Sequence, residues 1–211
     1  MNKHIILFFI ALIVITTPTY PFSSSSYLIT NTAVKLFDYK KAYSHLPPYN
    51  ENLNEIDLHN KLLTLTNLNL IDVAKKIAEQ ILETNMLNQE AWMVHLVSAK
   101  LKNSSEAFDK LAPIIKQEEM PLINYVFFNS NGTIKSTQES ARSIYEIVQS
   151  SLADPKSQDV DYNFILFLLT ISNILYPEFY EGYYYSAQIH QFLKNFEQAE
   201  IYYNMIPSTH N

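Results

Sequence analysis

The side chains that could bind a metal or transfer a proton are scattered along this chain. Its six histidines form no HExxH motif and no paired spacing, and no cysteine accompanies them because the chain contains none. They are His4, His45, His59, His95, His190 and His210. We therefore expect no metal site and no bound cofactor.

Two pairs of carboxylates are the remaining candidates for acid–base catalysis. Glu118 and Glu119 form one pair, and Glu178 and Glu181 form the other. Each pair lies near a predicted helix end, where carboxylates are commonly solvated or matched to the helix dipole. The chain has only two glycines and contains no Gly-rich phosphate loop, nucleophile elbow or dinucleotide fingerprint. The sequence therefore predicts a protein that is not an enzyme and has no evident small-molecule substrate.

A crowd of tyrosines near the C-terminus is the strongest candidate for a binding surface. Seven tyrosines fall within residues 176–203, and helical geometry does not allow all of them to face inward. They are Tyr176, Tyr180, Tyr183, Tyr184, Tyr185, Tyr202 and Tyr203. Exposed aromatic side chains of this kind are typical of surfaces that contact another protein or another structural unit.

The elements that carry these tyrosines form a helix–turn–helix unit over residues 177–207. Apolar side chains from Tyr180 to Leu193 recur mostly at three- and four-residue steps, which predicts one helix. Lys194 and Asn195 interrupt this pattern, and Asn195 with Gln198 has the spacing of a capping box. A second helix is predicted to run to Pro207, with Ala199, Tyr202, Tyr203 and Ile206 on its inner face.

Weaker copies of this unit recur upstream at a nearly constant period. The predicted second-helix starts Asn69, Asn103 and Ser136 are separated by 34 and 33 residues. The alanines Ala42, Ala74, Ala107 and Ala141, which follow the breaks, are separated by 32, 33 and 34 residues. Stacked two-helix units explain this period, because each unit leaves an apolar face that the next unit covers.

One segment departs from the period. Ala199 lies 58 residues after Ala141, and the extra length falls in a predicted loop at 153–161 and in the apolar run at 164–175. This run is too short to span a membrane. We therefore expect a helix that neighbours cover on both sides.

The pattern resembles the tetratricopeptide repeat (TPR), a helix pair with a period of ~34 residues. Ala187, Phe196, Ala199 and Tyr203 occupy positions where that family has small, aromatic, alanine and aromatic residues. The chain departs from the pattern at Tyr183, His190 and Ile206, where tryptophan, an aromatic residue and alanine are usual. As a whole it resembles the N-terminal part of longer exported bacterial TPR proteins, which implies a truncated or degenerate member. The expected fold is all-α, a right-handed α-solenoid of TPR-like helix–turn–helix units.

The resemblance also implies where a partner would bind. In this family, peptides lie in the concave groove formed by the first helix of each unit. The corresponding positions here are Tyr184, Gln188, Gln191, His59, Leu63, Met93, Val97 and Lys100. Two interpretations of the tyrosine-rich end remain open: a peptide groove, or an interface with a missing next unit.

The N-terminal segment has the features of a secretory signal. A basic Lys3 precedes an unbroken apolar run at residues 5–15, and Thr, Pro and Ser follow. Cleavage after Thr19 or within 23–26 would leave helical repeats at 27–152, a loop at 153–161, and a helix plus a TPR unit at 162–211. Without cysteine the exported fold would have no disulfide.

Two functional hypotheses follow from these features. The first is an exported, periplasmic, non-catalytic scaffold that binds a protein or peptide through its concave groove. The alternative is an assembly factor that retains its N-terminal segment as an inner-membrane anchor facing the periplasm. The net charge of −6 and the lack of a basic cluster argue against nucleic acid as a partner in either case.

Overall fold

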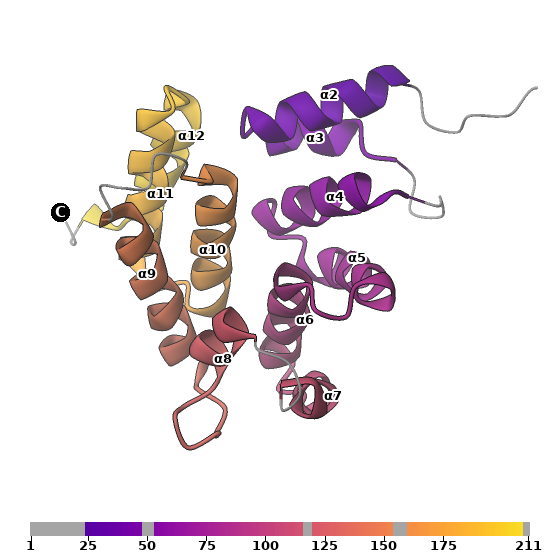
Figure 1. Cartoon of the computed structure of the whole chain (residues 1–211). Coiled ribbons are helices and arrows are strands. Elements are labelled where there is room, and N and C mark those ends of the chain that lie inside the picture. The colour runs from indigo at the N-terminus through magenta and orange to yellow at the C-terminus, as the bar shows by residue number, and fades with distance from the viewer. Residues whose placement is uncertain (1–23, 48–52, 116–119, 154–159, 209–211) are drawn as a thin grey trace, which may run out of the picture.

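The structure is a computed structural model that describes residues 24–47, 53–115, 120–153 and 160–208. Within these residues it is all-α, with eleven helices and no strand (Figure 1). Phe128 and Ile134 form one isolated β-bridge in the loop between two helices. The helices are α2 (Ser24–Lys35), α3 (Tyr39–Ser44), α4 (Glu55–Asn67), α5 (Ile71–Thr84), α6 (Gln89–Leu101), α7 (Glu106–Ile115), α8 (Pro121–Phe127), α9 (Thr137–Ala153), α10 (Tyr162–Leu175), α11 (Tyr180–Phe192) and α12 (Phe196–Tyr203).

Four helix pairs close with the same tight turn. The pairs are α2/α3, α4/α5, α6/α7 and α11/α12, and the residue at each turn has a left-handed backbone with φ between 52° and 59°. These residues are Phe37, Asn69, Asn103 and Lys194. At each turn the next amide donates across to a carbonyl five residues earlier, as in the Schellman motif. These bonds are Asp38 to Ala33, Leu70 to Leu65, Ser104 to Ala99 and Asn195 to His190, at 2.8 to 2.9 Å. The recurrence confirms that neighbouring helices pair in sequence order.

The helix caps confirm some predicted starts and correct others. Ser136 and Glu139 form the predicted capping box, with reciprocal hydrogen bonds of 2.7 and 3.2 Å. The predicted second-helix starts Asn69 and Asn103 are wrong, because α5 begins at Ile71 and α7 at Glu106. Both asparagines form the left-handed turn instead, a conformation that asparagine tolerates well. Asn195 does precede α12, but its side chain makes no capping hydrogen bond, so the capping box with Gln198 is absent.

Buried alanines bring the paired helices close together. The four alanines that define the period, and Ala199 of the last pair, are at most 4% exposed. They are Ala42, Ala74, Ala107, Ala141 and Ala199. The predicted inner-face position of Ile206 is wrong, because α12 ends at Tyr203 and Ile206 lies beyond it.

Helix α10 is the centre of the molecule. Ten of its fourteen residues are buried, which confirms the prediction that neighbours cover it. It packs against α4 and α6 on one side and α9 and α11 on the other, and Figure 1 shows it between the two groups of helices. Side-chain hydrogen bonds join it to its surroundings, among them Tyr39 to Asn163 at 3.1 Å, Thr170 to Asn67 at 3.0 Å, and Ser172 to the Ala141 carbonyl at 3.0 Å. The stack of helix pairs therefore folds back around one apolar helix.

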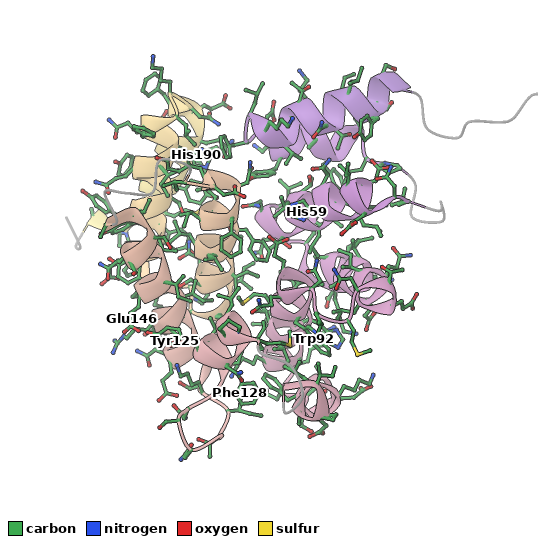
Figure 2. All side chains as sticks on the ribbon, in the orientation of Figure 1. His59, Trp92, Tyr125, Phe128, Glu146 and His190 are labelled. Atoms are coloured by element: carbon green, nitrogen blue, oxygen red, sulfur yellow. The ribbon has the colours of Figure 1, made fainter. Side chains whose placement is uncertain are left out.

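The first and last helix pairs also meet. Phe37, in the α2/α3 turn, packs edge-on against the ring of His190 in α11, with ring centroids 6.2 Å apart. His190 in turn stacks on Tyr202 of α12 at 5.4 Å. Figure 2 shows His190 on the side of α11 that faces α2 and α3. A single cluster of buried side chains consequently extends from Ala33 to Ile189.

The N-terminal predictions fall mostly outside the described residues. Of the predicted signal segment, only residues 24–26 are described, and they belong to α2. No described helix combines the length and the apolar character that crossing a membrane requires.

Candidate partner-binding surface

The groove predicted along the first helices is filled by the chain itself. Leu63 of α4 and Met93 and Val97 of α6 are at most 3% exposed, and α10 packs against both of these helices. In this conformation these three side chains are therefore not accessible to a partner. The prediction from the sequence assigned these positions to the concave face of the helix stack. It did not indicate that residues 162–175 return to cover that face.

His59 and Lys100, which were predicted for the same groove, make contacts within the chain. His59 Nδ1 lies 3.0 Å from Glu90 Oε2, which joins α4 to α6, and Figure 2 shows it on α4. The hydrogen bond to Glu90 raises the pKa of His59. Lys100 Nζ donates to the Lys135 carbonyl and lies 5.6 Å from the centre of the Phe108 ring. Burial lowers the pKa of Lys100.

The three predicted residues on α11 do form one exposed row. Tyr184, Gln188 and Gln191 are exposed, and Gln188 Nε2 donates to the Tyr184 hydroxyl at 2.9 Å. The hydroxyl of Tyr203, on α12, donates to Gln191 Oε1 at 3.2 Å, and its ring centroid is 6.1 Å from that of Tyr184. The structure therefore brings together the C-terminal part of the predicted site and separates it from the N-terminal part.

Tyr184 also borders a concavity of about 700 Å³ between α9 and α11, which we call the aromatic pocket. Its lining comes from α9, from the connection between α10 and α11, from α11 and from Ile206. The lining residues are Gln138, Arg142, Tyr145, Tyr176, Glu178, Phe179, Tyr180, Glu181, Tyr184, Tyr185 and Ile206. Six of these eleven residues are aromatic.

Tyr145 holds the rings of this pocket at right angles. Its ring centroid lies 5.0 Å from that of Phe179, with 89° between the ring planes, and 5.3 Å from that of Tyr185, with 90°. Edge-to-face contacts of this kind are favourable because the positive edge of one ring meets the negative face of the other. Burial raises the pKa of the Tyr145 hydroxyl to about 12, and a hydrogen bond with Tyr185 and the charge of Glu181 contribute. Tyr145 is therefore a neutral hydrogen-bonding group near neutral pH.

Sequence reasoning missed Tyr145 and Phe179. The tyrosines in 176–203 indicated one wall of the pocket. Tyr145 belongs to α9, which is separated from these tyrosines by α10 along the chain. Its place in the pocket follows from the packing of α9 on α10 and of α10 on α11. No local pattern in the sequence carries that information.

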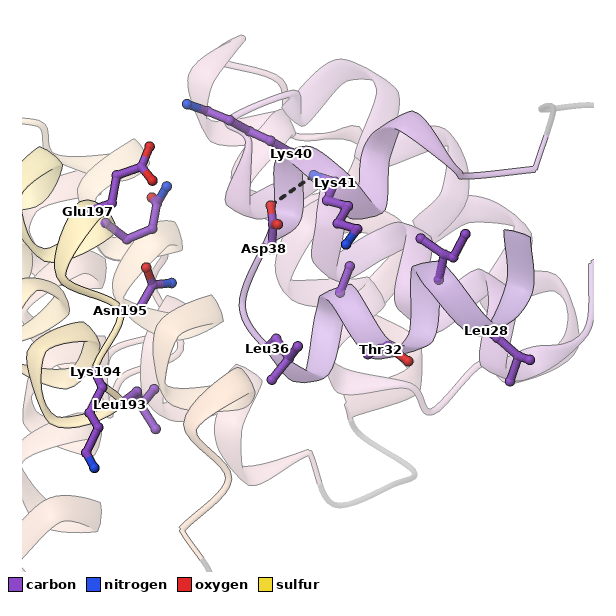
Figure 3. Close-up of a pocket in the computed structure, with 13 residues that line it drawn as sticks. Leu28, Thr32, Leu36, Asp38, Lys40, Lys41, Leu193, Lys194, Asn195 and Glu197 are labelled. Atoms are coloured by element: carbon purple, nitrogen blue, oxygen red, sulfur yellow. Dashed lines mark hydrogen bonds between the residues drawn. The ribbon is translucent and has the colours of Figure 1, made fainter. Parts of the chain in front are cut away.

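A second concavity of about 580 Å³ lies where the first and last helix pairs meet (Figure 3). Asp38, Lys40 and Lys41 line it from the α2/α3 side, and Lys194 and Glu197 line it from the α11/α12 side. Asp38 Oδ1 already accepts a hydrogen bond from the Lys41 amide at 3.0 Å, drawn as a dashed line in Figure 3. The charges are of both signs, so this concavity has no marked preference for an anion or a cation.

The described residues hold one further cluster of titratable side chains, around Glu79. No group of three or more histidine, aspartate or glutamate side chains in this part of the chain could hold a metal ion. His95 Nδ1 lies 3.7 Å from Glu79 Oε1, and burial lowers the pKa of His95. Lys75 Nζ lies 2.6 Å from the same carboxylate oxygen. Glu79 is therefore shared by a half-buried lysine and a buried histidine.

No family model, curated protein or solved structure matches the chain. The chemistry of the aromatic pocket and of the α11 row is therefore the basis for a functional proposal.

Proposed function

We propose that this chain is an exported, non-catalytic scaffold that binds a protein or peptide partner across α9 and α11. The contact surface consists of the aromatic pocket and the adjoining row of Tyr184, Gln188 and Gln191. In this proposal the helix pairs form a right-handed TPR-like superhelix whose usual groove is occupied by α10. The partner is displaced to the outer side of the C-terminal helices.

The observation that supports this proposal is the gathering of aromatic side chains around a surface concavity. Tyr184 is 45% exposed although it is large and borders the pocket. Tyrosine and tryptophan dominate the energetics of protein interfaces, because they bury a large area and keep a hydrogen-bonding group. The amides of Gln188 and Gln191 beside the rings offer donors and acceptors to a peptide backbone.

A peptide selection tests this surface. A random dodecapeptide display library is selected on the immobilised protein, and enriched peptides are titrated calorimetrically against wild type and a Tyr184→Ala, Gln188→Ala variant. Loss of an interface tyrosine costs about 1–2 kcal/mol or more, so we expect the variant to bind at least about fivefold more weakly. Tyr43→Ala is the matched control, because Tyr43 is 51% exposed on α3, away from the pocket. Equal binding by both variants would contradict the assignment of this surface.

Export is tested by the mass of the mature N-terminus. We expect the protein recovered from the periplasmic fraction to begin after Thr19 or within residues 23–26. Intact Met1 in the membrane fraction would contradict cleavage and favour the anchored form.

A further inference from the structure

The aromatic pocket has the geometry of a site for a positively charged group. Phe179 and Tyr185 stand at right angles to Tyr145, and all three rings line the pocket. A ring face is negative, and a cation within about 6 Å of a ring centroid is attracted to it. Several rings that line one pocket can act on the same cation.

Two carboxylates add to this negative field. Glu178 and Glu181 line the pocket, and both are exposed. Within the described residues, neither forms an ion pair with a lysine, arginine or histidine. The charge of Glu181 contributes to the raised pKa of Tyr145, so its field reaches the rings. The negative charge of these carboxylates is therefore available to a ligand.

One residue opposes a cation in this pocket. Arg142 of α9 is the single basic residue that lines it, and it is exposed. Its charge reduces the attraction for another cation. Because of Arg142, the pocket is not uniformly acidic. Removing the charge of Arg142 should strengthen the binding of a cation, whereas removing the carboxylate charges should weaken it.

We infer that the aromatic pocket binds a lysine or arginine side chain of the partner, with the cation held against the ring faces and within reach of Glu178 and Glu181. This inference rests on the proposed function, since it names the chemistry of the segment that the same surface would take. An apolar side chain would gain from the rings alone. A cation gains from the rings and from both carboxylates.

The test compares two peptides that differ only in charge. The probes are acetyl-Gly-Ser-Arg-Ser-Gly-amide and the same peptide with citrulline, which has nearly the shape of arginine but no charge. Binding is followed by the ring signals of the protein labelled with ¹³C-tyrosine. We expect the arginine peptide to bind at least about fivefold more tightly, with the difference decreasing as salt is added.

Charge variants locate the effect in the pocket. Glu178→Gln with Glu181→Gln should reduce the preference for arginine to less than about twofold, and Arg142→Gln should strengthen arginine binding by about threefold or more. Glu200→Gln is the matched control, because Glu200 is an exposed acid on α12 outside the lining. All four positions are exposed, so circular dichroism should show unchanged folding.

The outcomes separate this inference from the proposed function. Equal affinity for the two peptides, a preference for citrulline, or no shift of the tyrosine signals with either peptide would overturn the cation site. If display-selected peptides still require Tyr184 in that case, the proposed binding surface is retained and only its preference for a cation is rejected. If no selected peptide requires Tyr184 either, both fail.

Discussion

His190 is a buried histidine that the fold holds in its neutral form. It is 2% exposed, and it packs between Phe37 and Tyr202. Among the described residues its Nδ1 has no hydrogen-bond partner. Burial lowers its pKa to about 4, because the charged ring would lose its water without gaining a counter-charge. The ring packs between the α2/α3 pair and the α11/α12 pair, so its protonation would destabilise the contact between these two pairs.

We expect acid to weaken the fold through His190. In the unfolded chain His190 has an ordinary pKa near 6.5 and is protonated first, so stability is complete above that value and is lost as the pH falls toward 4. The expected loss from this residue is about 2 kcal/mol between pH 7 and pH 5. Urea denaturation at several pH values measures it, with His190→Phe as the comparison because phenylalanine keeps a stacking ring.

Other histidines make this comparison necessary. Burial also lowers the pKa of His95, so that residue acts in the same direction. His59 has a raised pKa because of Glu90, so its contribution is present at acid pH and is lost as the pH rises. Both remain in the His190→Phe protein. The assignment to His190 is wrong if the two proteins lose the same stability on acidification.

Gly182 is required by the approach of α10 to α11. A Cβ at this position would lie 2.1 Å from Asn173 Oδ1, and Asn173 is 6% exposed. We expect Gly182→Ala to lower the free energy of unfolding by about 1–3 kcal/mol in urea denaturation, because the buried amide must move. In an Asn173→Ala background the same change should be neutral, or stabilising by up to about 1 kcal/mol from helix propensity. An equal loss in both backgrounds would show that Asn173 is not the obstacle.

At the scale of the elements, Lys194 stores strain in the α11/α12 turn. Its φ of 59° is left-handed, which costs a residue with a Cβ about 1–2 kcal/mol compared with glycine. Lys194→Gly should therefore raise the free energy of unfolding by up to about 1 kcal/mol after the entropy that glycine loses on folding. Lys194→Ala removes the same side chain but keeps the strain, so it should bring no gain. Thermal or urea denaturation distinguishes the two variants.

The elements were predictable where the signal is local. The alanine spacing, the capping box at Ser136 and the covered helix at 164–175 follow from periodicity and from residue type. The sequence does not distinguish the left-handed turn role of Asn69 and Asn103 from a helix start, because asparagine suits both positions. In the structure α5 begins at Ile71 and α7 at Glu106. Among the candidate site positions, the shared helix face of Tyr184, Gln188 and Gln191 was predictable from their spacing. The burial of Leu63, Met93 and Val97 was not, because α10, which packs against α4 and α6, comes much later in the chain.

At the scale of the whole molecule, α10 distinguishes this chain from an open array of repeats. In an open array each unit contacts only its neighbours, so damage at one end leaves the other end folded. Here α10 contacts α4 and α6 as well as α9 and α11, and Phe37 contacts His190 across the ends. Since the two groups of helices share one core, they should unfold in a single transition.

Phe167 tests this shared core. It is fully buried on α10, and Phe167→Ala should lower the free energy of unfolding by about 3–5 kcal/mol. Trp92, the single tryptophan, is 4% exposed on α6. Its fluorescence therefore reports on the α4 and α6 side of α10, opposite α9 and α11. We expect the Trp92 transition to move to lower urea together with the circular dichroism transition. Phe196→Ala, at a phenylalanine that is 64% exposed on α12, should leave both nearly unchanged. A Trp92 transition that stays in place while the helical signal is lost in two steps would mean that α10 does not couple the two groups.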